Sequence, residues 1–182
     1  MVYRRRINRG VSFMKWVKRL ALGILIMTLV LVVGISVFKM IWDAGYYSGY
    51  DPALPLNAVI REEKAWPENE PKYRRVDFTF EGVDGQTVPA LAAFPLEGKG
   101  PFPCAVFLHG IGQDKEFLDD IAAPFVEAGF AFVSFDQYMR GERKLKGASR
   151  LEELLAFRRR GALTVLETRR LLDYLQTRED VA

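Results

Sequence analysis

Hydrophobic and polar positions divide the chain into two parts with different patterns. Leu20 to Phe38 form an apolar run of nineteen positions that contains no charged residue. As a helix this run would be roughly 28 Å long at about 1.5 Å per residue, close to the ~30 Å hydrocarbon layer of a membrane. From Tyr73 onward, short apolar segments alternate with polar turns, which predicts a folded domain of strands and helices.

The residues that flank the apolar run favour a single transmembrane helix over 20–38. Trp16 and Trp42 bracket the run, as aromatic residues at membrane interfaces do. Basic residues are concentrated in 1–19, so the positive-inside rule places this segment in the cytoplasm and the remainder outside it. A cleaved signal peptide is the main alternative, but its apolar core would be shorter and followed by small residues. A buried core helix would need a polar face, which this run lacks.

Charge is distributed unevenly between the two parts. The overall net charge is +3, but 1–42 hold eight Lys and Arg and no acidic residue. From residue 43 onward 18 basic face 23 acidic residues, a net charge of −5. We therefore expect membrane lipid to contact 20–38, and no nucleic acid as a partner. One Cys and one His exclude a zinc site built from these residue types, and we expect no metal and no cofactor.

A hairpin is predicted at the start of the domain. Residues 39–72 carry four prolines and little periodicity, which is typical of a linker. Residues 76–80 then alternate between apolar and polar, the period of a half-buried strand. An Asp-Gly turn signal follows at Asp84, and 87–95 form the returning strand. The domain therefore begins with an antiparallel pair.

The organising feature of the domain is the apolar segment 104–108, which runs directly into the His-Gly-x-Gly sequence of 109–112. A short continuous apolar run between Pro and Gly predicts a strand buried on both faces. The glycines permit a tight turn at the carboxyl end of this strand, where ligands bind in open α/β sheets. We expect the turn to present backbone N–H groups to a negatively charged group.

The remaining elements complete an α/β pattern. Asp114 is a plausible N-cap of a helix that ends near Gly129, and a second buried strand covers 130–135. Strand, helix and strand at this spacing predict a right-handed parallel βαβ unit. Ser149 and Glu152 form a capping-box pattern that opens a last helix, which we expect to be interrupted near Gly161.

From about Tyr73 to the end, the chain resembles the N-terminal half of an α/β-hydrolase, most closely the dienelactone hydrolase and acetyl xylan esterase-like branch. The resemblance rests on His109–Gly112 after a buried strand, Asp136 ending the next strand, Arg140-Gly141-Glu142-Arg143, Thr168 to Leu175, and Arg178-Glu179-Asp180-Val181. It implies a fold class of α/β, with a partial hydrolase sheet in 73–182 made of an antiparallel hairpin and a parallel βαβ unit. The N-terminal transmembrane helix precedes this domain.

The resemblance also implies a site and an activity on carboxylic esters or related acyl compounds. The backbone of Gly110 and Ile111 would form part of an oxyanion hole, in which the Ile111 N–H is the donor and Gly110 gives the turn. His109, Gly112 and Asp136 would be structural neighbours of that site. The nucleophile should follow in a G-x-S-x-G turn, and none of the five serines lies in such a sequence. We therefore expect a chain cut off before its catalytic triad, with no catalytic residue of its own and no activity alone. A small-molecule ester would be its substrate once the domain is completed.

Two alternatives belong to other functional classes. The missing triad favours a non-catalytic, membrane-tethered interaction module. A nucleotide-binding Rossmann-type enzyme is favoured by Gly110 and Gly112 after a strand and by Asp136 as a ribose-binding acid. The third glycine of that fingerprint would fall at 115, which is Lys115.

Overall fold

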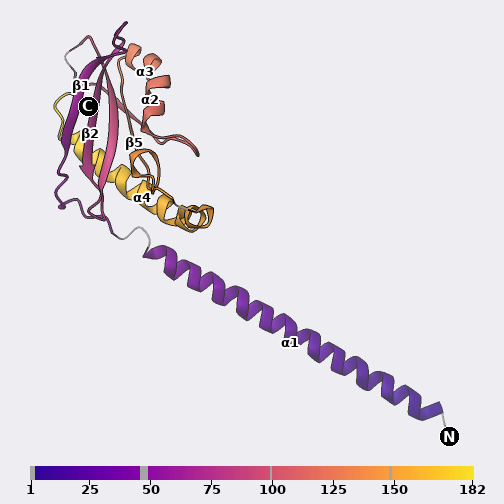
Figure 1. Ribbon diagram of the computed structural model, residues 1–182. Helices are drawn as coiled ribbons and strands as arrows, with labels where there is room; N and C mark the ends of the chain where they lie inside the picture. The colour runs from indigo at the N-terminus through magenta and orange to yellow at the C-terminus, as the bar shows by residue number, and fades with distance from the viewer. Residues whose placement is uncertain (1–2, 46–48, 99, 148) are drawn as a thin grey trace. The chain divides into compact units, whose positions relative to one another are not determined.

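The chain folds into two compact units, 1–48 and 49–182. The computed structural model describes residues 3–45, 49–98, 100–147 and 149–182, with side chains from residue 13 onward. The first unit is one helix, α1 (Tyr3–Ala44) (Figure 1). Its described apolar side chains are exposed. Its segment Phe13–Ala44 is, among the described residues, long and apolar enough to cross a membrane. The helix predicted over 20–38 is therefore present, and its insertion into a membrane remains a prediction.

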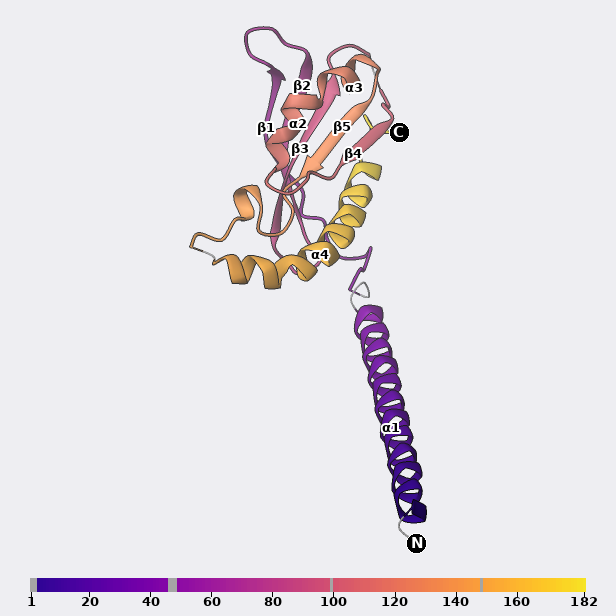
Figure 2. The same ribbon diagram turned by 90° about the vertical axis from the view of Figure 1, so that its right-hand side faces the viewer.

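A five-stranded mixed sheet forms the centre of the second unit. Its strands lie in the order β1-β2-β3-β5-β4 (Figure 2). Only β4 and β5 are parallel; the other neighbouring pairs are antiparallel. The strands are β1 (Val59–Trp66), β2 (Tyr73–Glu81), β3 (Thr87–Pro95), β4 (Cys104–Phe107) and β5 (Ala131–Phe135). The predicted hairpin and the parallel βαβ unit are both confirmed.

Strand β1 corrects the prediction that 39–72 form a linker, because it lies within that segment. It pairs antiparallel with β2 from Val59 opposite Thr79 to Trp66 opposite Tyr73. Most of its side chains are exposed, since it is an edge strand with a charged sequence. Its stability comes from the ladder with β2, which no local sequence pattern reveals.

Helices cover both faces of the sheet (Figure 1). On one face, Leu171 and Leu175 of α4 (Arg150–Gln176) pack against alternate residues of β2 and β3 such as Phe78 and Phe94. On the other face, the two short helices α2 (Leu118–Ile121) and α3 (Ala123–Glu127) pack on Leu91 and its neighbours. Because side chains alternate between the two faces along β2 and β3, these strands contribute residues to two separate hydrophobic cores, one on each face of the sheet.

Strand β4 differs from its prediction. It is shorter than expected, and all four of its residues are only half-buried, while Leu108 beyond it is exposed. The prediction of full burial on both faces is wrong, because β4 is an edge strand that pairs with β5 alone among the described residues. An edge strand has a neighbour on one side only, and less covering structure on its faces.

The two helical segments of the domain begin at the predicted N-caps, but the predictions of where they are interrupted are wrong. Asp114 is an N-cap that accepts a hydrogen bond from the N–H of Glu116, and Ser149 forms the predicted capping box. The helix after Gly112 is divided into a 3₁₀ turn, η1 (Lys115–Phe117), and then α2 and α3. Pro124, which has no N–H, stands in the first turn of α3 and accounts for the second break. Helix α4 runs through Gly161 without the predicted interruption.

Candidate oxyanion turn

The candidate site is the turn 109–112 at the carboxyl end of β4. Gly112 has a φ of +84°, a left-handed conformation that favours glycine. Because β4 and β5 are parallel, their carboxyl ends meet at one edge of the sheet. The turn therefore lies beside the loop that begins at Asp136, after β5.

His109 is buried beneath this turn and is held from two sides. The Gln137 N–H donates to His109 Nε2 at 3.3 Å, and the Gln137 side-chain amide donates to the His109 carbonyl at 2.8 Å. His109 Nδ1 lies 3.2 Å from the Gly110 carbonyl. Since Nε2 accepts, the ring proton is assigned to Nδ1, which donates to Gly110. Both ring nitrogens are thus engaged, and the side chain joins the β4 turn to the β5 loop.

The backbone amides of Gly110 and Ile111, the two residues of the predicted oxyanion hole, differ in their hydrogen bonding. The Gly110 N–H donates to Gln113 Oε1 at 2.8 Å, so this amide is already engaged. The Ile111 N–H has no acceptor among the described residues, and Ile111 is 85% exposed. Of the two amides, Ile111 alone can donate to a ligand without breaking a hydrogen bond of the turn.

Asp136 is buried, and its carboxylate joins two loops by hydrogen bonds to their backbone. We call this arrangement the Asp136 clamp. Its Oδ1 accepts from the Lys115 N–H at 2.9 Å, and its Oδ2 accepts from the Glu142 N–H at 2.9 Å. Burial raises the pKa of Asp136, and these two amide hydrogen bonds oppose the rise. Because Asp136 is 1% exposed, its carboxylate is not accessible to a ribose hydroxyl, which weakens the nucleotide-binding alternative.

Gly141 makes room for this clamp. It has a φ of +50°, and a Cβ added there would lie 2.1 Å from Asp136 Oδ1. Only glycine avoids this collision, because the contact is with a buried carboxylate that its own hydrogen bonds hold in place. Asp136 therefore helps to fix the conformation of Arg140-Gly141-Glu142-Arg143, one of the segments on which the family resemblance rests.

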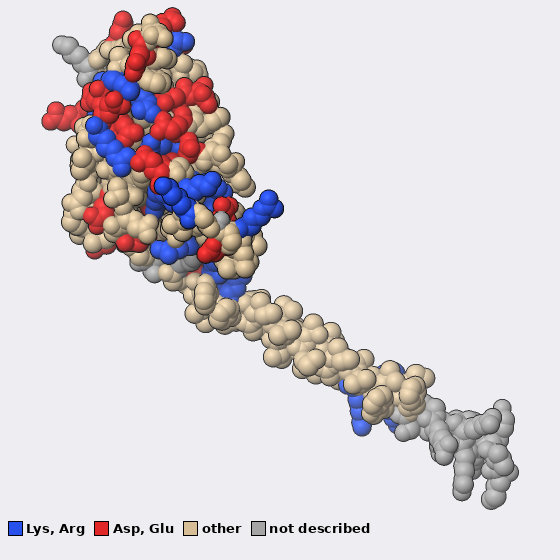
Figure 3. All heavy atoms as spheres, in the orientation of Figure 1, with Lys and Arg blue, Asp and Glu red and all other residues tan. Residues whose placement is uncertain are grey.

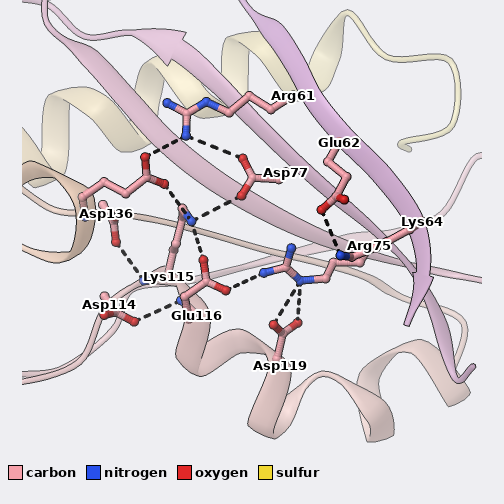
Figure 4. A network of polar contacts seen from close by, with 11 residues as sticks. Arg61, Glu62, Lys64, Arg75, Asp77, Asp114, Lys115, Glu116, Asp119 and Asp136 are labelled. Atoms are coloured by element: carbon pink, nitrogen blue, oxygen red, sulfur yellow. Dashed lines mark hydrogen bonds and ion pairs between the residues drawn. The ribbon is translucent and has the colours of Figure 1, made fainter. Parts of the chain in front are cut away.

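A buried lysine next to the clamp gathers carboxylates from three elements (Figure 4). Lys115 Nζ lies 3.4 Å from Asp77 Oδ2 and 3.0 Å from Glu142 Oε1, and it also contacts Glu116. Burial alone would lower the pKa of Lys115, but the hydrogen bonds to Glu116 and Glu142 outweigh it and raise the pKa. In the sequence, Lys115 stands out only as a mismatch to the glycine fingerprint. Two of its carboxylate partners, Asp77 and Glu142, are 38 and 27 residues away along the chain, so no local pattern links them to it.

The charged network continues across the sheet surface. Arg75 Nε donates to Asp119 at 3.0 Å and its guanidinium also contacts Glu116 (Figure 4). The Tyr73 hydroxyl donates to Asp119 Oδ1 at 2.7 Å, and burial together with this bond raises the pKa of Tyr73. Arg61 of β1 contacts Glu142 at 2.7 Å. These contacts attach η1 and α2, which follow the 109–112 turn, to β2, and they attach β1 to the loop at Glu142.

The described residues contain no group of three or more His, Cys, Asp or Glu side chains arranged to hold a metal ion. Cys104, the single cysteine, is half-buried in β4, and burial raises its pKa to about 11.

Comparison with known proteins identifies structures of similar fold but does not assign the chain to a family. No protein-family model and no curated protein matches the chain. Among solved structures, the chain is similar to an acetyl xylan esterase from Paenibacillus sp. R4, with a TM-score of 0.58 and 19% identity over 79% of this chain and 48% of that one. It is also similar to a cold-adapted esterase from an Arctic intertidal metagenomic library, with a TM-score of 0.53 and 21% identity over 70% of this chain and 52% of that one.

At these identities the likeness shows the fold alone. The chain spans about half the length of the two esterases, and it shares with them a mixed α/β sheet. The expected resemblance to acetyl xylan esterases is thus confirmed at the level of fold. The resemblance to dienelactone hydrolases remains a prediction.

Proposed function

We propose that 49–182 are the N-terminal half of a serine-type esterase domain, acting on carboxylic esters or related acyl compounds. The observation that carries this proposal is the exposed, unpaired Ile111 N–H at the carboxyl end of β4. The esterase-like fold supports it. In such a domain the amide would donate to the oxyanion that forms when a nucleophile attacks the ester carbonyl.

The rest of the catalytic machinery would come from outside the given sequence. Neither a G-x-S-x-G turn nor a free histidine is present, since His109 uses both ring nitrogens within the turn. The serine, the acid and the catalytic histidine would therefore lie on a continuation of the chain or on a second polypeptide. The second oxyanion donor would be the N–H after that serine. By itself the chain is proposed to be inactive.

We further propose that 20–38 cross a membrane once, with 1–19 in the cytoplasm and the hydrolase-like domain outside it. The apolar character of α1 supports this, together with the basic residues that precede the run. The helix would keep the domain at the membrane, where its substrate and any completing polypeptide would meet it.

The first test is to read the source DNA beyond codon 182. A continuing frame that encodes a strand and G-x-S-x-G supports the esterase, and the completed protein should then hydrolyse p-nitrophenyl acetate and react with a fluorophosphonate probe. Ile111→Pro removes the amide proton and should lower kcat by roughly 100-fold. Ile111→Ala keeps the amide and is the matched control, expected to act like the wild type. Equal activity of both variants would exclude the proposed role of Ile111.

A non-catalytic interaction module is the second candidate function. The half-buried edge strand β4 favours it, because an edge strand can pair with a strand of another chain. If no downstream or separate polypeptide confers fluorophosphonate reactivity, this candidate replaces the esterase. A partner should then protect the β4 amides from hydrogen exchange.

A further inference from the structure

The N-terminal half of α4 has its apolar residues on the outside. Leu151, Leu154 and Leu155 are 63%, 71% and 72% exposed, and Phe157 is 60% exposed. Leu145, in the preceding loop, is also exposed. We call these five residues the apolar patch. The three leucines follow the i, i+3, i+4 spacing of one helix face.

The inward side of the same helical segment is polar. Arg160 is buried and its Nε donates to the Tyr138 carbonyl at 3.0 Å. Farther along α4, Leu163 and Leu166 are buried as in an ordinary amphipathic helix. The first three turns therefore bury an arginine and expose leucines, an arrangement that is typical of a surface that binds another apolar phase.

Basic side chains lie close to the patch along the chain. The segment 144–158 contains four basic and two acidic residues, and all four of the basic residues are exposed. Figure 3 shows Lys and Arg gathered over this part of the domain, whereas acidic and basic side chains intermingle across the rest of the visible face. The four basic residues, which we call the basic belt, are Lys144, Lys146, Arg150 and Arg158.

We propose that the apolar patch and the basic belt dock on the surface of an anionic lipid bilayer. Exposed leucine and phenylalanine flanked by lysine and arginine is the composition of helices that lie in a membrane interface. The belt contrasts with the net charge of −5 from residue 43 onward, so the positive charge is concentrated where the apolar residues are. The inference rests on the proposed anchoring by 20–38, which keeps the domain near a bilayer, and does not depend on ester hydrolysis.

The experiment uses the full chain in lipid nanodiscs, with Cys104→Ala to remove the native thiol. A bimane dye is attached at Leu154→Cys in one sample and at Glu70→Cys in another. Glu70 lies in the turn between β1 and β2, which is at the opposite end of the sheet from the start of α4 (Figure 2). Brominated lipids should quench the dye at 154 at least threefold more strongly than the dye at 70. Raising the phosphatidylglycerol content should increase the difference, and salt should reduce it.

Two variants separate the contributions of the patch and the belt. Leu151→Glu with Leu155→Glu changes only exposed positions and should abolish the quenching at 154. Lys144→Glu with Lys146→Glu should leave quenching in neutral lipid unchanged and remove its increase with phosphatidylglycerol.

Equal quenching at 154 and 70 would overturn the docking. A dye at 154 that is shielded from water but not quenched by bromolipid would also overturn it, because a protein surface would then cover the patch. If the chain does not enter nanodiscs, the anchoring fails instead. The same labelled chain, in a dispersed form, then tests the patch against brominated phosphatidylglycerol vesicles, where absence of quenching overturns the docking.

Discussion

The backbone N–H of Lys115 donates a 2.9 Å hydrogen bond to Oδ1 of Asp136, a residue that lies 21 positions later in the chain. This bond joins the segment after the oxyanion turn to the end of β5. The ammonium group of the same lysine holds carboxylates of β2 and of the loop at Glu142. One residue thus connects the turn, the sheet and the loop after β5.

Replacing Lys115 should expose the cost of removing one cation from its carboxylate partners. Lys115→Met should lower the free energy of unfolding of the chain in detergent by about 1 kcal/mol, since Asp77, Glu116 and Glu142 lose one of their cationic partners but keep Arg61 or Arg75, and the two glutamates are about half exposed. Adding Glu142→Gln should restore part of this loss, which a double-mutant cycle of denaturant unfolding would measure. Additive losses in the cycle would contradict a direct Lys115–Glu142 coupling.

Gly141→Ala should be severely destabilising. The new Cβ would collide with Asp136 and also occupy a left-handed backbone, and we expect a loss of about 3 kcal/mol or more. Gly147→Ala is the matched control, because its φ is +80° but nothing lies within 4 Å of an added Cβ. It should lose about 1 kcal/mol from the backbone strain alone. Thermal unfolding of both variants measures the difference, and equal losses would rule out the collision.

Gly161→Ala should stabilise the protein. Gly161 lies inside α4, and nothing lies within 4 Å of the added Cβ. The gain should be about 0.8 kcal/mol, the difference in helix propensity between the two residues. Ala156→Gly, in the same helix, should lose a similar amount. A destabilised Gly161→Ala variant in the same unfolding assay would indicate that α4 bends at this position.

The Cys104 thiol should react slowly in the folded chain. Burial raises its pKa to about 11, so the thiolate fraction at pH 8 falls roughly 100-fold relative to an ordinary cysteine. Alkylation by iodoacetamide should be correspondingly slow at pH 8 and accelerate toward pH 11. The chain unfolded in guanidinium chloride provides the control and should react at the rate of a free thiol. Equal rates in both states would show that β4 leaves the thiol open.

Asp180 should contribute stability that is lost in acid. Burial alone would raise its pKa, but hydrogen bonds from Arg178 and Arg74 outweigh it and lower the pKa from 3.8 to about 2. A depressed pKa means that the contribution is present above about pH 4 and disappears as the pH falls toward 2. Asp180→Asn should lose about 1 kcal/mol at pH 7, a value reduced for partial exposure to water.

The measurement is the unfolding free energy of wild type and Asp180→Asn at several pH values. The difference should narrow between pH 4 and pH 2. A difference that is independent of pH over this interval would exclude the ion pairs as its source.

Local sequence patterns determined most of the elements of this protein and the positions of two helix caps. The apolar run 20–38 is helical. Two helical segments begin at Asp114 and Ser149, whose side chains accept hydrogen bonds from backbone N–H groups of the first turn. The hairpin and the βαβ unit follow from periods of two and from turn residues. Each of these features depends on residues a few positions apart, so a single segment carries the information.

Only the tertiary structure decided which strands lie at the edges and which polar groups are occupied. Strand β1 exists through its ladder with β2, and β4 is half-buried because it is an edge. The amide of Gln137, 28 residues along the chain, occupies the carbonyl of His109. The ion pairs of Lys115 join residues that are distant in sequence. Charge, exposure and hydrogen bonding at these positions depend on neighbours that folding brings together, and no local pattern records them.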